Sequence, residues 1–324
     1  MTDFHLVADI LDSKIAQEPI RKGFGRGLLK AGQLDEQVMA LCADLTGSTQ
    51  ISVFAEAFPE RFVEVGIAEQ NLVTVGSGLA AMGKIPFVSS YAAFSPGRNW
   101  EQIKTTICLN DQPVKIVGAH AGLYTSADGA THQMLEDIAL MRVLPRMVVI
   151  VPCDSLEAEK ATLALAQDYK NPGYIRLARD KTPIITTDKT PFEIGKAYNY
   201  AKGDDITIIS TGTMTYHALV AAEKLFKDGI DADVIHVPTI KPLDLETILK
   251  SVRKTRAVIT VEEAQVIGGL GSAVAELLGE ECPRPLKRLG VKDRFGESGT
   301  PEELLNLHGL TAKHIMFTAH ELLG

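Results

Sequence analysis

The stretch Arg61–Asn71, RFVEVGIAEQN, decides the fold. It combines a short β-prone run, a glycine and a carboxylate placed where a helix begins. The helix predicted after it, over residues 71–82, is so rich in small and apolar side chains that it must be packed on most sides. Glu69 is therefore expected to be partly buried, and a buried carboxylate needs a partner.

Apolar runs recur around this stretch and alternate with helical patterns. In the first half of the chain the predicted strands are 37–42, 86–91, 114–118, 147–151 and 174–177. The predicted helices are 9–32 (with Pro19 interrupting the pattern), 71–82, 98–108, 133–143 and 155–167. Continuously apolar strands that alternate with helices predict a parallel sheet covered on both faces.

Residues 181–189 are polar and turn-like, and they predict a domain boundary. A second alternating set follows, with predicted strands 206–210, 233–237, 257–261 and 285–289 and predicted helices 214–227, 245–252 and 270–278. The predicted fold class is α/β, with two doubly wound domains of mostly parallel sheets over residues 1–186 and 187–324.

Composition excludes several classes of protein. The chain has 324 residues, enough for about two domains. Its net charge of -8 and lack of a basic cluster disfavour nucleic acid as a partner. No apolar run reaches the ~18 residues of a membrane helix, and the N-terminus lacks a signal-peptide pattern, so we expect a cytoplasmic protein without membrane attachment. Four dispersed cysteines without CxxC spacing indicate neither a metal site nor a disulfide framework.

In an open parallel sheet, ligands bind where the strands end at their carboxyl sides. The residues that follow the predicted strands there are rich in acids, rings and guanidinium groups: 44–48, Glu69, 91–98, 120–132 and Arg179. Each has a plainer interpretation by itself. Glu69 could only favour a helix dipole, Tyr91 and Phe94 could be ordinary core rings, and the spacing of the histidines matches no familiar metal site.

Four motifs together resemble the C-terminal half of transketolases. They are Ala43–Thr46 (ADLT), Glu64–Asn71 (EVGIAEQN), Asp128–Gln133 (DGATHQ) and Gly290–Pro301 (GVKDRFGESGTP), in the order and spacing of that family. The resemblance runs from about Pro19 to the end of the chain. It implies a pyrimidine-binding domain of a thiamine diphosphate enzyme, followed by the transketolase C-terminal domain.

The resemblance implies thiamine diphosphate as cofactor. In this family a glutamate at the position of Glu69 hydrogen-bonds N1′ of the aminopyrimidine and stabilises its imino tautomer. A carboxylate in an apolar site can share a proton with a ring nitrogen, whereas in water it would ionise. Rings at the positions of Tyr91 and Phe94 would pack against the aminopyrimidine, and Asp44 would lie close to the cofactor.

The resemblance also implies transfer of a two-carbon ketol unit from a ketose phosphate to an aldose phosphate, as in the pentose phosphate pathway. Asp128 would hydrogen-bond a substrate hydroxyl, with His120 and His132 in the substrate channel. Arg21, Ser48, His120 and Arg179 match positions that hold the sugar phosphate, where two guanidinium groups make chemical sense. A solvated helix arginine is the plainer interpretation of Arg21.

The sequence also lacks a motif of this family. Thiamine enzymes hold the Mg²⁺ (or Ca²⁺) and diphosphate through a Gly-Asp-Gly motif followed by an asparagine, and no Gly-Asp-Gly occurs in this chain. The resemblance therefore implies the C-terminal subunit of a split transketolase. An N-terminal partner chain with that motif would complete each site, plausibly in a heterotetramer with two copies of each chain.

Three other interpretations stay open. Ala127 stands where many relatives have a glutamate, and Tyr124 and Ser126 also depart from the common loop, so the resemblance predicts the cofactor but not the particular sugar. The chain could be the β-subunit of a 2-oxo acid dehydrogenase or resemble a deoxyxylulose-phosphate synthase, or it could be a non-catalytic scaffold paralogue. Gly268–Ser272 follows a predicted strand and opens a predicted helix, but it lacks phosphate-loop spacing and is interpreted as a tight turn.

Overall fold

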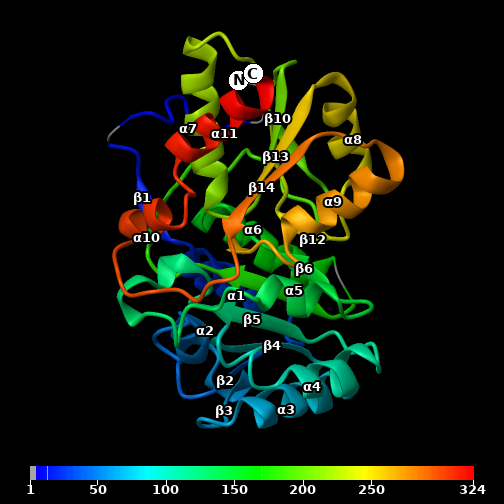
Figure 1. The fold of residues 1–324 in the computed structure, drawn as a ribbon. Helices are drawn as coiled ribbons and strands as arrows, with labels where there is room; N and C mark the ends of the chain where they lie inside the picture. Colours follow the sequence, from blue (N-terminus) through cyan, green and yellow to red (C-terminus); the bar gives the residue numbers. More distant parts are fainter. Residues whose placement is uncertain (1–4, 13, 169) are drawn as a thin grey trace.

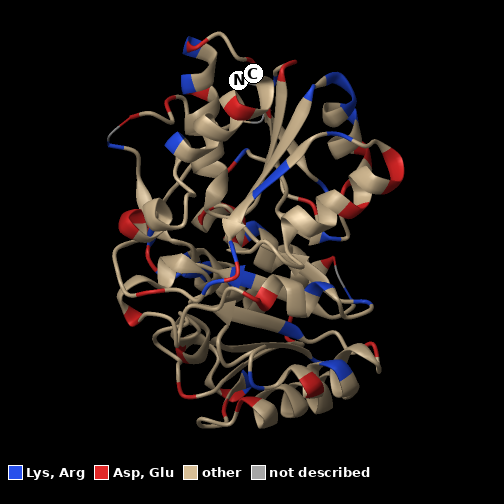
Figure 2. Cartoon of the chain, viewed as in Figure 1, with Lys and Arg blue, Asp and Glu red and all other residues tan. Residues whose placement is uncertain are grey.

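The computed structural model describes residues 5–12, 14–168 and 170–324. They form two mostly parallel sheets with helices on their faces, stacked one above the other in Figure 1. The predicted α/β class with two doubly wound units is confirmed. Charged side chains gather on loops and outer helices, whereas the strands are mostly tan in Figure 2. This matches strands that are buried on both faces.

The lower sheet in Figure 1 has seven strands in the order β12-β6-β7-β5-β4-β2-β3. All neighbours pair in parallel except β12 with β6. The strands are β2 (Val38–Cys42), β3 (Phe62–Glu64), β4 (Ile85–Tyr91), β5 (Lys115–Ala119), β6 (Val148–Ile150), β7 (Gly173–Leu177) and β12 (Thr239–Lys241). In register, Tyr91, Ala119 and Leu177 lie side by side, so the residues that follow these strands share one edge of the sheet.

The helices of this part are α1 (Ile20–Leu34), α2 (Ser52–Ala57), α3 (Glu69–Ala81), α4 (Trp100–Gln102), α5 (Asp137–Arg142) and α6 (Ser155–Gln167). A π-helical segment, Ile103–Cys108, extends α4. Helix α1 packs closely on α6, because a Cβ on Gly23 would lie 1.7 Å from the carbonyl oxygen of Ser155. This contact fixes the start of α1, where Arg21 lies.

The upper sheet has five strands in the order β14-β13-β10-β11-β9, with only β9 antiparallel to its neighbour. Its strands are β9 (Tyr198–Ala201), β10 (Ile206–Ser210), β11 (Ala232–His236), β13 (Ala257–Gln265) and β14 (Leu286–Val291). The helices are α7 (Met214–Lys227), α8 (Leu245–Lys254), α9 (Leu270–Glu281), α10 (Pro301–Leu307) and α11 (Ala312–Leu323).

Buried polar contacts join the two sheets. Strand β12 follows the upper sheet's β11 in sequence but pairs with β6, so it covers that edge of the lower sheet. Arg176 on β7 forms buried ion pairs with Asp137 (2.9 Å) and with Glu263 of β13 (3.2 Å). Because these charges are taken out of water together, the two units are held in one relative position.

Some predicted elements are wrong in their extent. The helix predicted over 9–32 begins only at Ile20, because Pro19 lacks an N–H and stands at its N-terminal boundary. Before this helix, β1 (Gln17–Pro19) pairs antiparallel with β8 (Lys181–Pro183). Strand β8 lies inside residues 181–189, which were predicted to be turn-like. Residue 13, within the predicted helix, lies outside the described residues. The helix predicted from residue 133 begins at Asp137. Strands β9 and β12 and helices α10 and α11 were not predicted. The boundary after residue 186 stays a prediction.

Candidate functional site

Four rings gather where β4 and β5 end, and we call them the ring cluster: Tyr91, Phe94, His120 and His132. The centroid of Tyr91 lies 3.8 Å from that of His120 in a stacked arrangement and 6.1 Å from that of Phe94. His132 meets Phe94 edge-on at 5.6 Å. The structure thus brings together four predicted site residues from two loops, and the three partly exposed rings, Tyr91, Phe94 and His132, suit contact with a flat heterocycle.

The imidazole of His120 is neutral at physiological pH. Burial lowers its pKa to about 3, and the charges of Arg21, Arg179 and His132 act in the same direction. Its side chain is 2% exposed, and no described residue is within hydrogen-bonding distance of Nδ1. A buried ring nitrogen without a partner is costly, so this atom is available to a ligand.

Glu69 is the first residue of α3 and is buried, with 2% of its surface exposed. Nη1 of Arg98 donates to its Oε2 at 2.6 Å, and Nδ2 of Asn99 donates to its backbone carbonyl at 2.8 Å. The Arg98 guanidinium also lies 5.3 Å from the centre of the Phe94 ring. Glu69 and the ring cluster are therefore connected through a cation that borders both.

Two arginines whose charges act on His120, together with two acids near them, form what we call the arginine cluster: Arg21, Arg179, Asp128 and Asp180. Arg179 faces Asp128 at 3.7 Å and Asp180 at 3.4 Å. Burial lowers the pKa of Arg21, and the charge of Arg179 lowers it further, while Tyr91, Asp180 and Asp128 oppose the shift. Nη1 of Arg21 donates to the backbone carbonyl of Ser48 at 2.5 Å. The predicted set Arg21, Ser48, His120 and Arg179 thus lies together.

The C-terminal motif of the resemblance packs on the loop that carries Asp128. A Cβ on Gly129 would lie 2.6 Å from Oγ of Ser298, and Nε2 of Gln133 donates to the carbonyl of Glu297 at 2.9 Å. The same amide donates to the carbonyl of Ser126 at 3.1 Å. The upper unit therefore helps to shape the edge of the lower sheet.

Asp44 follows β2 at the same edge, but its described contacts point to β3. Its backbone N–H donates to Oε1 of Glu64 at 2.7 Å, and its φ of 58° lies in the left-handed region. The other oxygen of Glu64 accepts from Thr46 at 3.0 Å. The carboxylate of Asp44 is exposed, and among the residues that the structure describes no hydrogen bond or ion pair joins it to the ring cluster.

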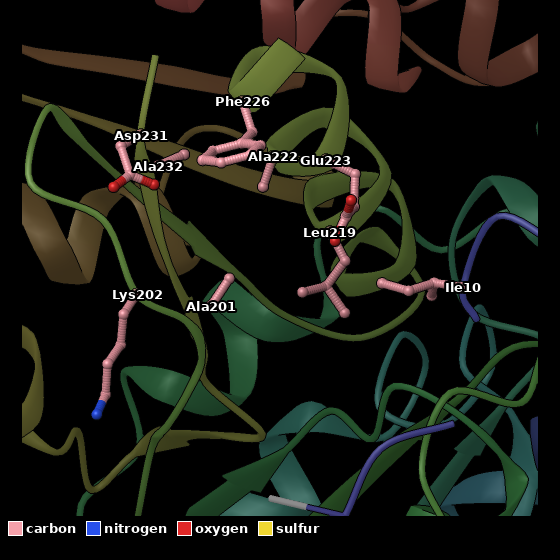
Figure 3. Close-up of a pocket in the computed structure, with 9 residues that line it drawn as sticks. All are labelled: Ile10, Ala201, Lys202, Leu219, Ala222, Glu223, Phe226, Asp231 and Ala232. Carbon is pink, nitrogen blue, oxygen red and sulfur yellow. The ribbon is translucent and has the colours of Figure 1, made fainter. Parts of the chain in front are cut away.

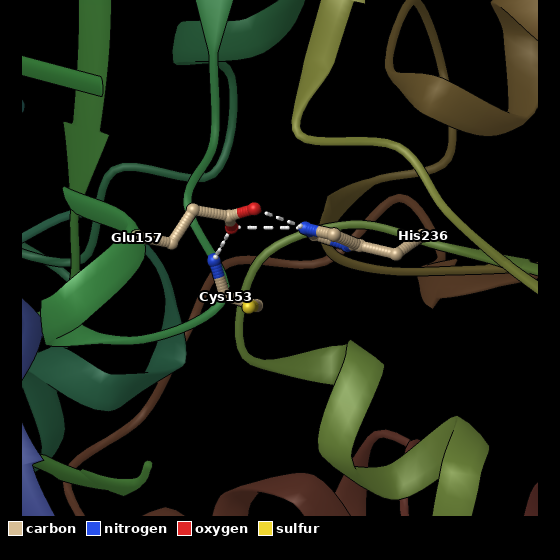
Figure 4. Close-up of side chains that lie close together, drawn as sticks. All are labelled: Cys153, Glu157 and His236. Atoms are coloured by element: carbon tan, nitrogen blue, oxygen red, sulfur yellow. Dashed lines mark hydrogen bonds and ion pairs between the residues drawn. The ribbon is translucent and has the colours of Figure 1, made fainter. Parts of the chain in front are cut away.

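A second group of potential ligands lies between the sheets and is already satisfied. Figure 4 shows buried Cys153, Glu157 and His236 with their side chains converging. Nε2 of His236 lies 2.9 and 3.0 Å from the Glu157 oxygens, and its Nδ1 lies 2.8 Å from Oγ1 of Thr215. Burial alone would raise the pKa of Glu157, but the charge and hydrogen bonds of His236 lower it. Both ring nitrogens are engaged, so we interpret the group as a contact that joins the sheets.

Two further places in the upper unit show no sign of a reactive site. The pocket in Figure 3 lies between α7 and the neighbouring strands, and its lining includes Ile10, Leu219 and Phe226, none of which belongs to the ring or arginine cluster. At the start of α9, the N–H groups of Leu270 and Gly271 donate to Glu262 at 2.7 and 2.8 Å. The anion position after Gly268 is thus filled by the chain's own carboxylate.

Family comparisons agree with this architecture. Residues 17–184 match the model described as "Transketolase, pyrimidine binding domain", and residues 195–315 match "Transketolase, C-terminal domain". The two models together span most of the chain and match its two doubly wound units. The chain belongs to the transketolase family.

Three relatives that match this chain over nearly their whole length are named as a subunit or a section of a transketolase. The 6-deoxy-6-sulfo-D-fructose transketolase subunit of Clostridium sp. (strain MSTE9) is 44% identical, over 95% of this chain and 96% of that protein. A putative transketolase C-terminal section of Methanocaldococcus jannaschii is 45% identical over 91% and 93%. One subunit of the apulose-4-phosphate transketolase of Phocaeicola vulgatus is 39% identical over 93% and 96%.

Solved transketolase structures share the fold of this chain. A chain described as "Split gene transketolase, inactive beta4 tetramer" superposes with a TM-score of 0.88 at 46% identity, covering 94% of this chain and 98% of that one. The transketolase of Campylobacter jejuni shares the fold, with a TM-score of 0.80 at 21% identity, and this chain covers 48% of it.

Sequence reasoning gave no role to three residues that the structure places at the site: Arg98, Ser126 and Asp180. Arg98 could have been found, because a buried carboxylate at Glu69 requires a nearby cation and Arg98 ends the loop that carries the predicted rings. Asp180 directly follows Arg179 but gave no signal, since an acid next to an arginine in a loop is usually solvated. The roles of the predicted site residues stay predictions.

Proposed function

We propose that this chain is the C-terminal subunit of a split transketolase. With thiamine diphosphate and an N-terminal partner chain, it would transfer a two-carbon ketol unit from a ketose phosphate to an aldose phosphate. The observation that carries the proposal is the buried Glu69 beside the ring cluster, at the edge where parallel sheets bind their ligands.

The residues present fit the pyrimidine end of the cofactor. A buried carboxylate, two rings with partly exposed faces, and a buried imidazole nitrogen without a described partner are the groups that a flat, nitrogen-bearing ring requires. Glu69 would hold N1′, while Tyr91 and Phe94 would pack against the ring. The Arg98 guanidinium, which now borders both Glu69 and Phe94, would have to share Glu69 or move.

When bound, thiamine diphosphate supplies the electron sink for breaking a carbon–carbon bond. The chain would contribute orientation and hydrogen bonds. Asp128 would accept a hydrogen bond from a substrate hydroxyl, and neutral His120 could exchange a hydrogen bond through Nδ1 without adding charge. His132 would face the same substrate oxygens, and Arg21, Ser48 and Arg179 would hold the far end of the sugar.

The partner chain would supply the Gly-Asp-Gly motif and hold the diphosphate through Mg²⁺ or Ca²⁺. Three relatives that match this chain over more than nine-tenths of both lengths are named as subunits or a section, which supports this proposal. A heterotetramer with two copies of each chain and a role in the pentose phosphate pathway belong to the same proposal. Two of these relatives are named for other sugars, a sulfofructose and an apulose phosphate.

Reconstitution tests the proposal. The chain is mixed with a candidate N-terminal chain, thiamine diphosphate and Mg²⁺, and ketol transfer from xylulose 5-phosphate to ribose 5-phosphate is compared with decarboxylation of pyruvate. We expect transfer that requires both chains and the cofactor. Turnover of pyruvate alone would instead favour a 2-oxo acid dehydrogenase or deoxyxylulose-phosphate synthase type of enzyme. Failure to bind the cofactor with the partner present would favour a scaffold role.

The helices of the chain also bear on whether it could cross a membrane. Within the described ranges, no helix combines the length and the apolar character needed to cross a membrane. The cytoplasmic location stays a prediction.

A further inference from the structure

The charges of the arginine cluster cancel. Arg21 and Arg179 bring two positive charges, and Asp128 and Asp180 bring two negative charges at neutral pH. His120, which borders this cluster, is neutral because burial lowers its pKa to about 3. A site that binds a phosphate dianion usually provides excess positive charge, so this balance is unexpected for the far end of a sugar phosphate.

Asp180 is fixed as part of this site. The hydroxyl of Ser126 donates to Oδ2 of Asp180, while Arg179 lies 3.4 Å from Oδ1. The backbone N–H of Asp180 donates to the carbonyl of Tyr124 at 3.2 Å. Both carboxylate oxygens and the backbone thus have partners, so the negative charge stays beside Arg179 instead of turning into solvent.

Ser126 holds this position at a conformational cost. Its φ of 59° and ψ of -120° lie in a region that favours glycine, yet its side chain is buried. The hydrogen bond from its hydroxyl to Asp180 offsets part of this cost. The same segment then continues to Asp128, the other acid of the arginine cluster.

Two buried nitrogen atoms remain for a ligand, one that can donate and one that can donate or accept according to the tautomer of its ring. Nε of Arg21 and Nδ1 of His120 are both buried, and neither finds a hydrogen-bond partner among the described residues. One belongs to a guanidinium and the other to a neutral ring. A dianion in this charge-balanced set would leave two uncompensated charges in a partly buried place, whereas a monoanion would leave one, and Coulomb energies are large at such a place.

We propose that Asp180, held by Ser126, is a specificity-determining residue that opens the far end of the sugar site to a singly charged tetrahedral group. This rests on the proposed ketol transfer. A sugar that ends in a sulfonate would then be used at least as well as the corresponding sugar phosphate. Asp180 acts by offsetting Arg179, and replacing it with a neutral side chain restores a net positive charge that favours phosphate.

The first test measures binding without catalysis. Labelled histidine in the chain, with the His120 resonance assigned by its loss in His120→Gln, is titrated at pH 8 with methanesulfonate, a monoanion, and with methyl phosphate, a dianion. We expect methanesulfonate to shift the His120 resonance at equal or lower concentration. Asp180→Asn should strengthen binding of methyl phosphate about tenfold relative to methanesulfonate, a size limited by partial exposure of the site.

Matched variants separate charge from folding. Asp188→Asn removes an exposed acid from the same part of the chain and should leave the binding ratio unchanged. Ser126→Gly fits the positive φ and frees Asp180, so it should move the ratio in the same direction as Asp180→Asn but less far. A wild-type chain that prefers methyl phosphate tenfold, with the ratio unmoved by Asp180→Asn, would overturn the proposal.

The second test uses the reconstituted enzyme and the ratio of kcat/KM for donors that end in phosphate or in sulfonate. We expect a ratio near or below one in the wild type and a rise of about tenfold in Asp180→Asn. A strong phosphate preference that Asp180→Asn leaves unmoved would overturn the proposal while the proposed function stands. If neither donor reacts, the proposed function fails, and the binding ratio still decides the role of Asp180.

Discussion

The carboxyl-end edges of the two sheets differ in how their polar groups are satisfied. At the lower sheet, Nδ1 of His120 and Nε of Arg21 are buried without described partners. At the upper sheet, Glu262 accepts from the first N–H groups of α9, and His236 is bonded on both nitrogens. The lower edge leaves a ring nitrogen and a guanidinium N–H for a ligand, whereas at the upper edge the buried acid and imidazole are bonded within the chain, although the hydroxyl of Thr213 there also lacks a described partner.

This difference teaches that a doubly wound fold alone does not define a ligand site. Both sheets offer strand ends and a helix N-terminus, the features that bind ligands in α/β proteins. In the upper unit a buried glutamate takes the place an anion would occupy. Glycine at position 269 permits this, because a Cβ there would lie 2.0 Å from Oε2 of Glu262. The candidate site therefore differs from the matching edge of the upper sheet less in topology than in whether the buried polar groups have hydrogen-bond partners.

The largest expected effect is a loss of turnover at the carboxyl-end edge of the lower sheet, which we call the open edge because it leaves groups for a ligand. Glu69→Ala should lower turnover of the reconstituted enzyme about 10²- to 10⁴-fold, the usual contribution of a positioned acid–base group. Steady-state kinetics of ketol transfer measures it, with Glu101→Ala as control because Glu101 is an exposed acid near the same loop. Near-normal turnover of Glu69→Ala would remove Glu69 from the proposed mechanism.

At the carboxyl-end edge of the upper sheet, which we call the closed edge, a comparable substitution should lower stability instead of turnover. His236→Ala leaves the buried carboxylate of Glu157 without its main partner, and such losses cost about 3–5 kcal/mol. Urea unfolding of the chain measures the change. If His236→Ala has the stability of the wild type but abolishes turnover in the reconstituted enzyme, the assignment of a structural role to the closed edge is contradicted.

A smaller effect concerns pH. Burial raises the pKa of Glu262 to about 7, so its stabilising contribution is complete below its ordinary pKa of ~4.3 and is lost as pH rises through about 7. Glu262→Gln does not titrate. The free energy of unfolding, measured in urea at pH 5 and pH 8, should therefore be higher for Glu262→Gln relative to wild type at pH 8 than at pH 5. The exposed Glu280→Gln on α9 should show no such difference, and an equal offset of Glu262→Gln at both pH values would contradict the prediction.

The smallest effect is the absence of a titration. Because burial and the neighbouring charges lower the pKa of His120 to about 3, its ring signal should stay constant between pH 5 and pH 8. Histidine NMR, with the signal assigned through His120→Gln, measures this. A midpoint near 6.5 would mean that the ring is solvated, and this edge of the lower sheet would then lack its buried ring nitrogen without a partner.

Much of the lower unit could be predicted from local pattern. Helix α3 begins within two residues of the predicted start, because its small apolar residues allow no other element. The ends of β4, β5 and β7 also follow from apolar runs, and this placed Tyr91, His120 and Arg179 at one edge. Strands β9 and β12 were missed because each is short and pairs antiparallel at a sheet edge, where neighbours distant in sequence decide the structure.

The sequence by itself determined the α/β class, the family resemblance and the identity of most candidate site residues, because these depend on hydrophobic period and motif spacing. Only the tertiary structure decided how those residues are paired. Arg98 reaches Glu69 across 29 residues, Ser126 reaches Asp180 across 54, and Glu262 fills the start of α9. Such pairings are set by burial, which makes each polar group find a partner wherever packing brings one within reach.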